Sequence, residues 1–77
     1  MIEETRQLDA RGLRCPLPIL KTKKVLAEMQ PGEKLLVFAT DPGSIVDFST
    51  FASNTGHLLL ESGKQGDEYV FLVQKRA

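Results

Sequence analysis

The sequence contains one cysteine, and its neighbours are residue types that can activate a thiol. Cys15 follows Arg14 and precedes Pro16 and Pro18, and it fits no apolar periodic pattern. The thiolate is the nucleophilic form of cysteine, and positive charge or a helix N-terminus favours it. The pattern therefore indicates an exposed thiol with nucleophilic chemistry. The alternative is a small buried hydrophobic side chain, which is the usual state of a free cysteine.

Three features predict a lowered pKa for the Cys15 thiol. If Pro16 is the first helical residue, Cys15 is the N-cap and faces the positive end of the helix dipole. The N–H groups of Leu17 and Ile19 are then free to donate to the sulfur. Alternatively the helix starts at Pro18, which disfavours helical geometry in the residue before it, and Cys15 lies on a loop above the helix. The other two features are the basic neighbours and the rigidity that two prolines impose.

Basic residues gather around the cysteine, although the chain as a whole has no net charge. Residues 6–24 carry six Lys and Arg side chains against Asp9 alone, which gives the segment a charge of +5. We expect the three lysines of this segment to be exposed and to steer acidic partners. A solvated surface without a function is the alternative. The six basic residues are Arg6, Arg11, Arg14, Lys21, Lys23 and Lys24.

Length and composition exclude several classes of protein. The 77 residues form one domain, 1–77, whose thin core leaves little room for a deep enclosed pocket. A carrier or binding module is therefore favoured over a self-contained enzyme. One cysteine and one histidine can form neither an internal disulfide nor a metal site of thiolates and imidazoles. We expect no metal and no cofactor.

The same features predict the compartment. No apolar run is long enough to span a bilayer, and the acidic N-terminus lacks the apolar core of an export signal. A secreted domain of this size would usually contain disulfides. We therefore expect a cytoplasmic protein that does not contact a membrane.

Periodicity and turn residues predict the element order β-α-β-α-β-β. A proline–glycine pair ends the first helix, and Gly56 ends the second. Two short helices cannot cover both faces of a four-stranded sheet, and right-handed crossovers place both helices on one face. The fold class is therefore α+β, a two-layer α/β sandwich. The predicted strands are 5–10, 34–40, 57–62 and 69–75, and the predicted helices are 16–29 (or 18–29) and 42–55.

The first helix has an apolar face and two leucines that do not belong to it. Leu17 and Leu20 project about 140° and about 160° from the centre of the apolar stripe. Together with the lysines around them they form a candidate docking patch, with an apolar centre and a charged edge. We expect five residues to bind partners: Leu17, Leu20, Lys21, Lys23 and Lys24. The stripe itself consists of Ile19, Thr22, Val25, Leu26 and Met29.

The acidic residues at the start of the second helix are interpreted as helix caps. Asp41 can cap a helix that has Pro42 as its first residue, and Asp47 can complete a capping box with Ser44. Capping therefore explains both carboxylates without a catalytic role. The inner face of this helix is predicted to be Ile45, Phe48, Ala52 and Thr55.

The segment around the cysteine resembles the signature of the TusA/SirA-like family of sulfur carriers, which is marked by a Cys-Pro-x-Pro motif at the start of the first helix. The matching segment is Leu8-Asp9-Ala10-Arg11-Gly12-Leu13-Arg14-Cys15-Pro16-Leu17-Pro18. Further matches to that family are Lys23-Lys24, Asp41-Pro42 and Asp47-Phe48. The resemblance covers essentially the whole chain. It implies a two-layer sandwich with a mixed four-stranded sheet.

The resemblance also implies a function. A cysteine desulfurase or a rhodanese-like donor would load Cys15 with persulfide sulfur, and an acceptor protein would unload it. The supporting residues of the motif would be Arg14, Pro16 and Pro18. Members serve tRNA thiolation, molybdenum cofactor assembly, sulfur metabolism and selenium handling. The chain would be a sulfurtransferase-type carrier rather than a stand-alone enzyme, and a monomer when free. It lacks the second cysteine that some relatives have in the second helix, where Phe51-Ala52-Ser53 stands.

Two other functions are compatible with parts of the sequence. A non-catalytic RNA- or protein-binding module would use the basic segment 6–24 and leave Cys15 incidental. The zero net charge and the lack of exposed aromatic residues argue against RNA, so we do not expect direct contact with nucleic acid. A stand-alone transferase would need a substrate pocket or a base near Cys15, and the sequence predicts neither. We expect a structural role for His57.

Overall fold

The computed structural model describes residues 5–76, and its elements follow the order that the sequence predicts. In chain order they are β1 (Thr5–Ala10), α1 (Leu17–Ala27), β2 (Lys34–Ala39), α2 (Ser44–Thr55), β3 (Leu58–Gln65) and β4 (Glu68–Gln74). The last two strands run further into their hairpin than predicted, so that only Gly66 and Asp67 separate them. A glycine with φ of 61° makes this short turn possible.

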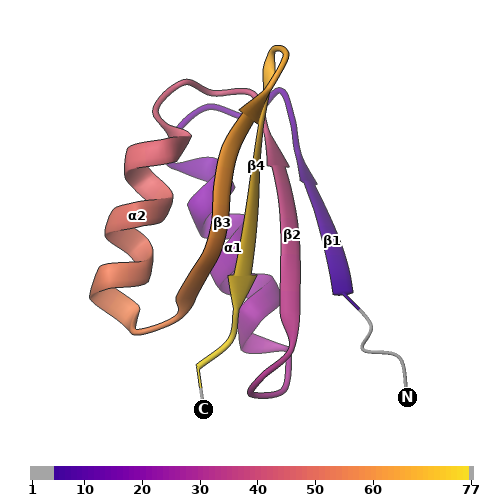
Figure 1. The fold of residues 1–77 in the computed structure, drawn as a ribbon, viewed down its shortest axis with the longest axis vertical. Helices are drawn as coiled ribbons and strands as arrows, with labels where there is room; N and C mark the ends of the chain where they lie inside the picture. The colour runs from indigo at the N-terminus through magenta and orange to yellow at the C-terminus, as the bar shows by residue number, and fades with distance from the viewer. Residues whose placement is uncertain (1–4, 77) are drawn as a thin grey trace.

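The four strands form one mixed sheet in the order β1-β2-β4-β3. β1 is parallel to β2, whereas β4 is antiparallel to both of its neighbours, β2 and β3. Both helices cover the same face of this sheet (Figure 1). The predicted two-layer α/β sandwich is therefore confirmed. In the part of the chain that the structure describes, no helix is long and apolar enough to cross a membrane.

The core lies between the sheet and the helices. Every second residue of the central strands faces it, so that Leu35 and Val37 of β2 are fully buried. Phe48 of α2 stacks on Phe71 of β4, with the ring centroids 4.2 Å apart and the ring planes 7° from parallel. This stacked pair fixes α2 against the sheet, because both rings are completely enclosed.

Helix α2 is rotated relative to the prediction. Its buried residues are Ser44, Phe48 and Phe51, whereas Ile45 is 40% exposed. The two phenylalanines take the interior positions because aromatic rings remove the most apolar surface from water. The predicted inner face was therefore right for Phe48 and wrong for Ile45. Gly56 ends the helix in the left-handed conformation, as predicted, with φ of 83°.

Helix α1 presents the predicted apolar face to the sheet. Thr22 and Leu26 are buried, and Ile19 is half-buried. The hydroxyl of Thr22 donates to the carbonyl of Pro18 at 2.8 Å, which satisfies it inside the core. Leu17 is 46% exposed and Leu20 is 51% exposed, so both point away from the sheet as expected.

The two helices begin at the same edge of the sheet. β1 and β2 are parallel, so their carboxyl ends lie side by side, and each leads through a short loop into a helix. A hydrogen bond of 2.8 Å from the Gly12 N–H to the Thr40 hydroxyl ties these two loops together. Residues far apart in the sequence therefore meet at this edge.

Candidate functional site

Cys15 lies at that edge, in the loop between β1 and α1. Its side chain is exposed, and its thiol donates a hydrogen bond to Oδ2 of Asp47 in the first turn of α2. The peptide bond between Cys15 and Pro16 is cis. The structure thus places the predicted thiol next to a carboxylate that comes from 32 positions further along the chain.

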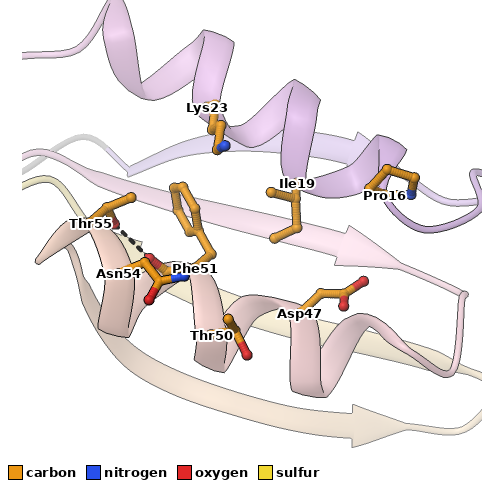
Figure 2. A pocket seen from close by; sticks show the side chains of 8 residues that line it. All are labelled: Pro16, Ile19, Lys23, Asp47, Thr50, Phe51, Asn54 and Thr55. Atoms are coloured by element: carbon orange, nitrogen blue, oxygen red, sulfur yellow. Dashed lines mark hydrogen bonds between the residues drawn. The ribbon is translucent and has the colours of Figure 1, made fainter.

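Packing of the neighbouring residue explains why Asp47 reaches the thiol. Phe48 is held inside the core by Phe71, and this fixes the rotation of α2. Asp47 is half-buried, and its carboxylate points across to the end of α1 that carries Pro16 (Figure 2). The contact therefore follows from tertiary packing rather than from local sequence.

The prediction that Asp47 caps its own helix is wrong. The N-cap of α2 is Gly43, and no side-chain hydrogen bond caps the helix. Asp41 instead accepts the N–H of Gly43 at 2.9 Å, which shapes the loop before the helix. A signal for the contact between Asp47 and Cys15 was present in the topology, because two helices that follow parallel neighbouring strands must begin at one edge.

The pKa of the Cys15 thiol is raised above its ordinary value, contrary to the prediction. The largest cause is the hydrogen bond to Asp47, which is followed by desolvation and by the negative charges of Asp47 and Asp41. The helix begins at Leu17 with Pro16 as its N-cap, so Cys15 lies one residue before the N-cap and not at it. The Leu17 N–H donates to the carbonyl of Arg14 at 2.8 Å and is not available to the sulfur.

The basic residues are distributed differently from the predicted cluster. Arg11 bonds to Asp9 at 2.9 Å and to Glu68 at 3.4 Å, and it lies over the ring of Phe38. Phe38 alternates with the core residues of β2, so Arg11 covers the sheet face without helices. Arg14 is exposed in the same loop as Cys15. The acidic neighbours of the thiol therefore outweigh the basic ones.

The predicted docking patch divides between two sides of α1. At 100° per residue, four members share what we call the outer face of α1. Lys23 lies apart from them and lines a groove between α1 and α2. All five residues are exposed, as expected. The outer face of α1 consists of Leu17, Leu20, Lys21 and Lys24.

The interhelix groove begins beside the thiol. It encloses about 260 Å³ between α1 and α2, and its lining includes Pro16 and Asp47, the two residues that adjoin Cys15. The expectation of no pocket near Cys15 is therefore wrong, and the carboxylate that lies at the thiol raises the pKa of that thiol. Further lining residues are Ile19, Lys23, Phe51 and Asn54.

His57 has no part in this site. Nδ1 of His57 accepts the N–H of Arg76 at 3.1 Å, and its ring packs near Phe51. This is the structural role predicted for His57. Within residues 5–76, no group of three or more His, Cys, Asp or Glu side chains is placed to hold a metal ion.

A comparison with protein families identifies the chain. The model of the family described as Sulfurtransferase TusA matches residues 6–75, nearly the whole sequence. The chain belongs to the TusA family. The predicted resemblance to the TusA/SirA-like carriers is thereby confirmed.

Curated members of the TusA family resemble this chain over their full length. The sulfur carrier protein TusA of Allochromatium vinosum is 51% identical over 75 residues, which cover 97% of this chain and 99% of that protein. A putative sulfur carrier protein of Neisseria meningitidis is 49% identical, with coverage of 90% and 93%. The putative sulfur carrier protein YrkI of Bacillus subtilis is 42% identical, with coverage of 96% and 99%.

Solved structures share the TusA fold. A SirA-like protein from Desulfitobacterium hafniense superposes with a TM-score of 0.80 at 24% identity, covering 96% of this chain and 100% of that one. A protein from Helicobacter pylori gives a TM-score of 0.74 at 24% identity, with coverage of 94% and 99%. At this level of identity the likeness concerns the fold alone.

Proposed function

We propose that this member of the TusA family carries sulfur as a persulfide on Cys15. The observation that carries the proposal is the exposed thiol of Cys15, held by Asp47 at the start of two helices. Family membership supplies the class of function, sulfur transfer. The proposed acceptor atom is the sulfur of Cys15, because Cys15 is the single cysteine of the sequence.

The transfer step needs only a persulfide donor. The Cys15 thiol loses its proton to solvent, and the thiolate attacks the terminal sulfur of the donor persulfide. The S–S bond of the donor breaks, and its electron pair stays on the inner sulfur, which takes up a proton. One S–S bond forms and one breaks, so no oxidant or reductant is consumed. Unloading repeats the step with an acceptor thiolate as the attacking group.

The partners follow from this chemistry. A cysteine desulfurase or a rhodanese-like protein presents a persulfide and is the proposed donor. The proposed acceptor is a protein that supplies sulfur to tRNA thiolation, to molybdenum cofactor assembly or to sulfur metabolism. A reducing compartment, the cytoplasm, suits a carrier whose one cysteine must return to the free thiol.

We assign partner docking to the outer face of α1. Leu17 and Leu20 expose apolar surface within one turn of the loop that carries Cys15, and Lys21 and Lys24 lie at their edge. An apolar centre with a charged edge is the usual arrangement of a protein interface. The lysines increase the rate of encounter with acidic partners, and the leucines exclude water while sulfur passes.

Mass spectrometry of the intact protein tests the proposal. Wild-type protein incubated with a cysteine desulfurase and cysteine should gain the mass of one sulfur atom, and a reductant should reverse the gain. Cys15→Ser should gain nothing, because a hydroxyl forms no persulfide. The same gain in both proteins, or none in either, would refute a persulfide on Cys15 and favour the binding-module alternative.

A further inference from the structure

The interhelix groove carries two charges of opposite sign that have no protein counter-charge. Asp47 lies at the end beside Cys15, and Lys23 lies further along, beyond Ile19 (Figure 2). Within residues 5–76, the Lys23 ammonium forms no ion pair or hydrogen bond, and Asp47 bonds only to the Cys15 thiol. One carboxylate oxygen, Oδ1 of Asp47, therefore remains available to a ligand.

The walls between these charges are mostly apolar. Ile19 reaches down from α1 and Phe51 reaches up from α2, and the amide of Asn54 lies at the rim (Figure 2). The groove's volume of about 260 Å³ corresponds to roughly nine water molecules at about 30 Å³ each. That is below the roughly 300 to 1,000 Å³ of sites for drug-sized molecules. The size suits a single amino acid or a very short peptide.

We propose that the groove binds a low-molecular-weight persulfide that carries both an ammonium and a carboxylate group, so that Cys15 can be loaded without a protein donor. The ligand's ammonium lies against Asp47, its carboxylate is directed to Lys23, and its terminal sulfur lies at the Cys15 thiol. This inference rests on the proposed persulfide function of Cys15. It adds a second source of sulfur and the residues that select it.

Binding of such a ligand also removes the restraint on the thiol. The hydrogen bond and the negative charge of Asp47 keep Cys15 protonated, because they raise the pKa of the thiol. A ligand ammonium at Asp47 offsets that charge and favours the thiolate. The sulfur of Cys15 then attacks the ligand's terminal sulfur, and the ligand's S–S bond breaks. The inner sulfur takes the proton that Cys15 released and leaves as an ordinary thiol.

Loading kinetics with three small persulfides test the selection. Cysteine persulfide has both charged groups, cysteamine persulfide lacks the carboxylate, and 3-mercaptopropionate persulfide lacks the ammonium. With cysteine persulfide, the rate of sulfur gain at Cys15 should saturate as its concentration rises. Each truncated persulfide should load roughly tenfold more slowly at low concentration, because one charged hydrogen bond is lost. Rates that are linear in concentration and equal for all three would overturn the proposal.

Two substitutions assign each charge to its ligand group. Lys23→Gln should abolish the advantage of cysteine persulfide over cysteamine persulfide, and Asp47→Asn should abolish its advantage over 3-mercaptopropionate persulfide. The ratio between two persulfides on one variant cancels any change in thiol reactivity. Lys64→Gln and Asp67→Asn, which lie in the β3–β4 hairpin away from the groove, should keep the wild-type ratios. Unchanged ratios in the groove variants would contradict the assignment.

Binding of a ligand in the groove can also be measured without sulfur transfer. S-methylthiocysteine is an analogue of cysteine persulfide that cannot react with Cys15→Ser. Titrated into this variant, it should shift the amide resonances of Ile19 and Phe51, and the shifts should saturate. A parallel loading with a cysteine desulfurase separates the two proposals. If the desulfurase loads Cys15 but the small persulfides show no saturation or selection, only the groove proposal fails. If neither source loads Cys15, the persulfide function itself fails.

Discussion

The thiol of Cys15 rests against the carboxylate of Asp47, and this contact disfavours the thiolate, which is the nucleophilic form of cysteine. Reaction with oxidants and electrophiles depends on the fraction of thiolate, which a raised pKa lowers. The contact therefore protects an exposed thiol. Under the groove proposal, a ligand cation that pairs with Asp47 would activate the thiol.

Asp47→Asn should make the Cys15 thiol more reactive. Loss of the carboxylate removes the largest cause of the raised pKa, so more thiolate is present at neutral pH. We expect iodoacetamide to alkylate the variant several-fold faster than wild type at neutral pH, and the midpoint of the rate against pH to move down. Asp41→Asn should shift the midpoint in the same direction but less, because Asp41 acts only through its charge at longer range. An unchanged midpoint in Asp47→Asn would contradict the role of the contact.

At the scale of elements, two strand–helix units build the site together. β1 with α1 supplies Cys15, and β2 with α2 supplies Asp47. The parallel pairing of the two strands brings both loops to one edge, and the bond from Gly12 to Thr40 joins them. A site made in this way depends on the packing of both helices.

Periodicity and turn residues predicted most of these elements, because both are local properties of the chain. The exposure of Leu17 and Leu20 followed from the helical projection in the same way. The contact between Cys15 and Asp47 did not, because it depends on how Phe48 packs across the core. A capping role for Asp47 agreed with the local pattern, so local reasoning had no ground to reject it. The prediction of a lowered pKa for Cys15 failed because it did not include this contact with Asp47.

The outer face of α1 should be required for protein-to-protein transfer and not for folding. In Leu17→Ser with Leu20→Ser, both changes fall on exposed positions, where substitutions usually alter the free energy of unfolding by about 0.5 kcal/mol or less each. We expect near-normal thermal unfolding and alkylation of Cys15, with transfer from a cysteine desulfurase reduced at least several-fold. Normal transfer in a folded double variant would place docking elsewhere.

At the scale of the whole molecule, the proton on Cys15 is linked to folding. The thiol's pKa is raised in the folded state relative to the unfolded chain, so its stabilising contribution is complete below the unfolded value, about 8.5. That contribution is lost as pH rises through the folded value, because the thiolate then faces Asp47. Deprotonation therefore weakens the fold.

Stability measurements against pH should reveal this linkage. The difference in melting temperature between wild type and Cys15→Ser should be constant near neutral pH. From about pH 8.5 upward, the melting temperature of wild type should fall relative to that of Cys15→Ser. Taking the difference removes the pH-dependent contributions that both proteins share. The same difference measured in the Asp47→Asn background should be smaller. A difference that stays flat through this range would refute the linkage.

The single thiol at one edge of the molecule also determines the order of events in a relay. Under the proposed function, a donor and an acceptor would both approach the Cys15 sulfur across the same two loops, so they would exclude each other. Each sulfur atom would then travel on a carrier that has left one partner and has not yet met the next. The flow of sulfur through such a pathway would be proportional to the number of carriers in circulation. It would also be limited by how long the loaded form survives among the small thiols of the cell.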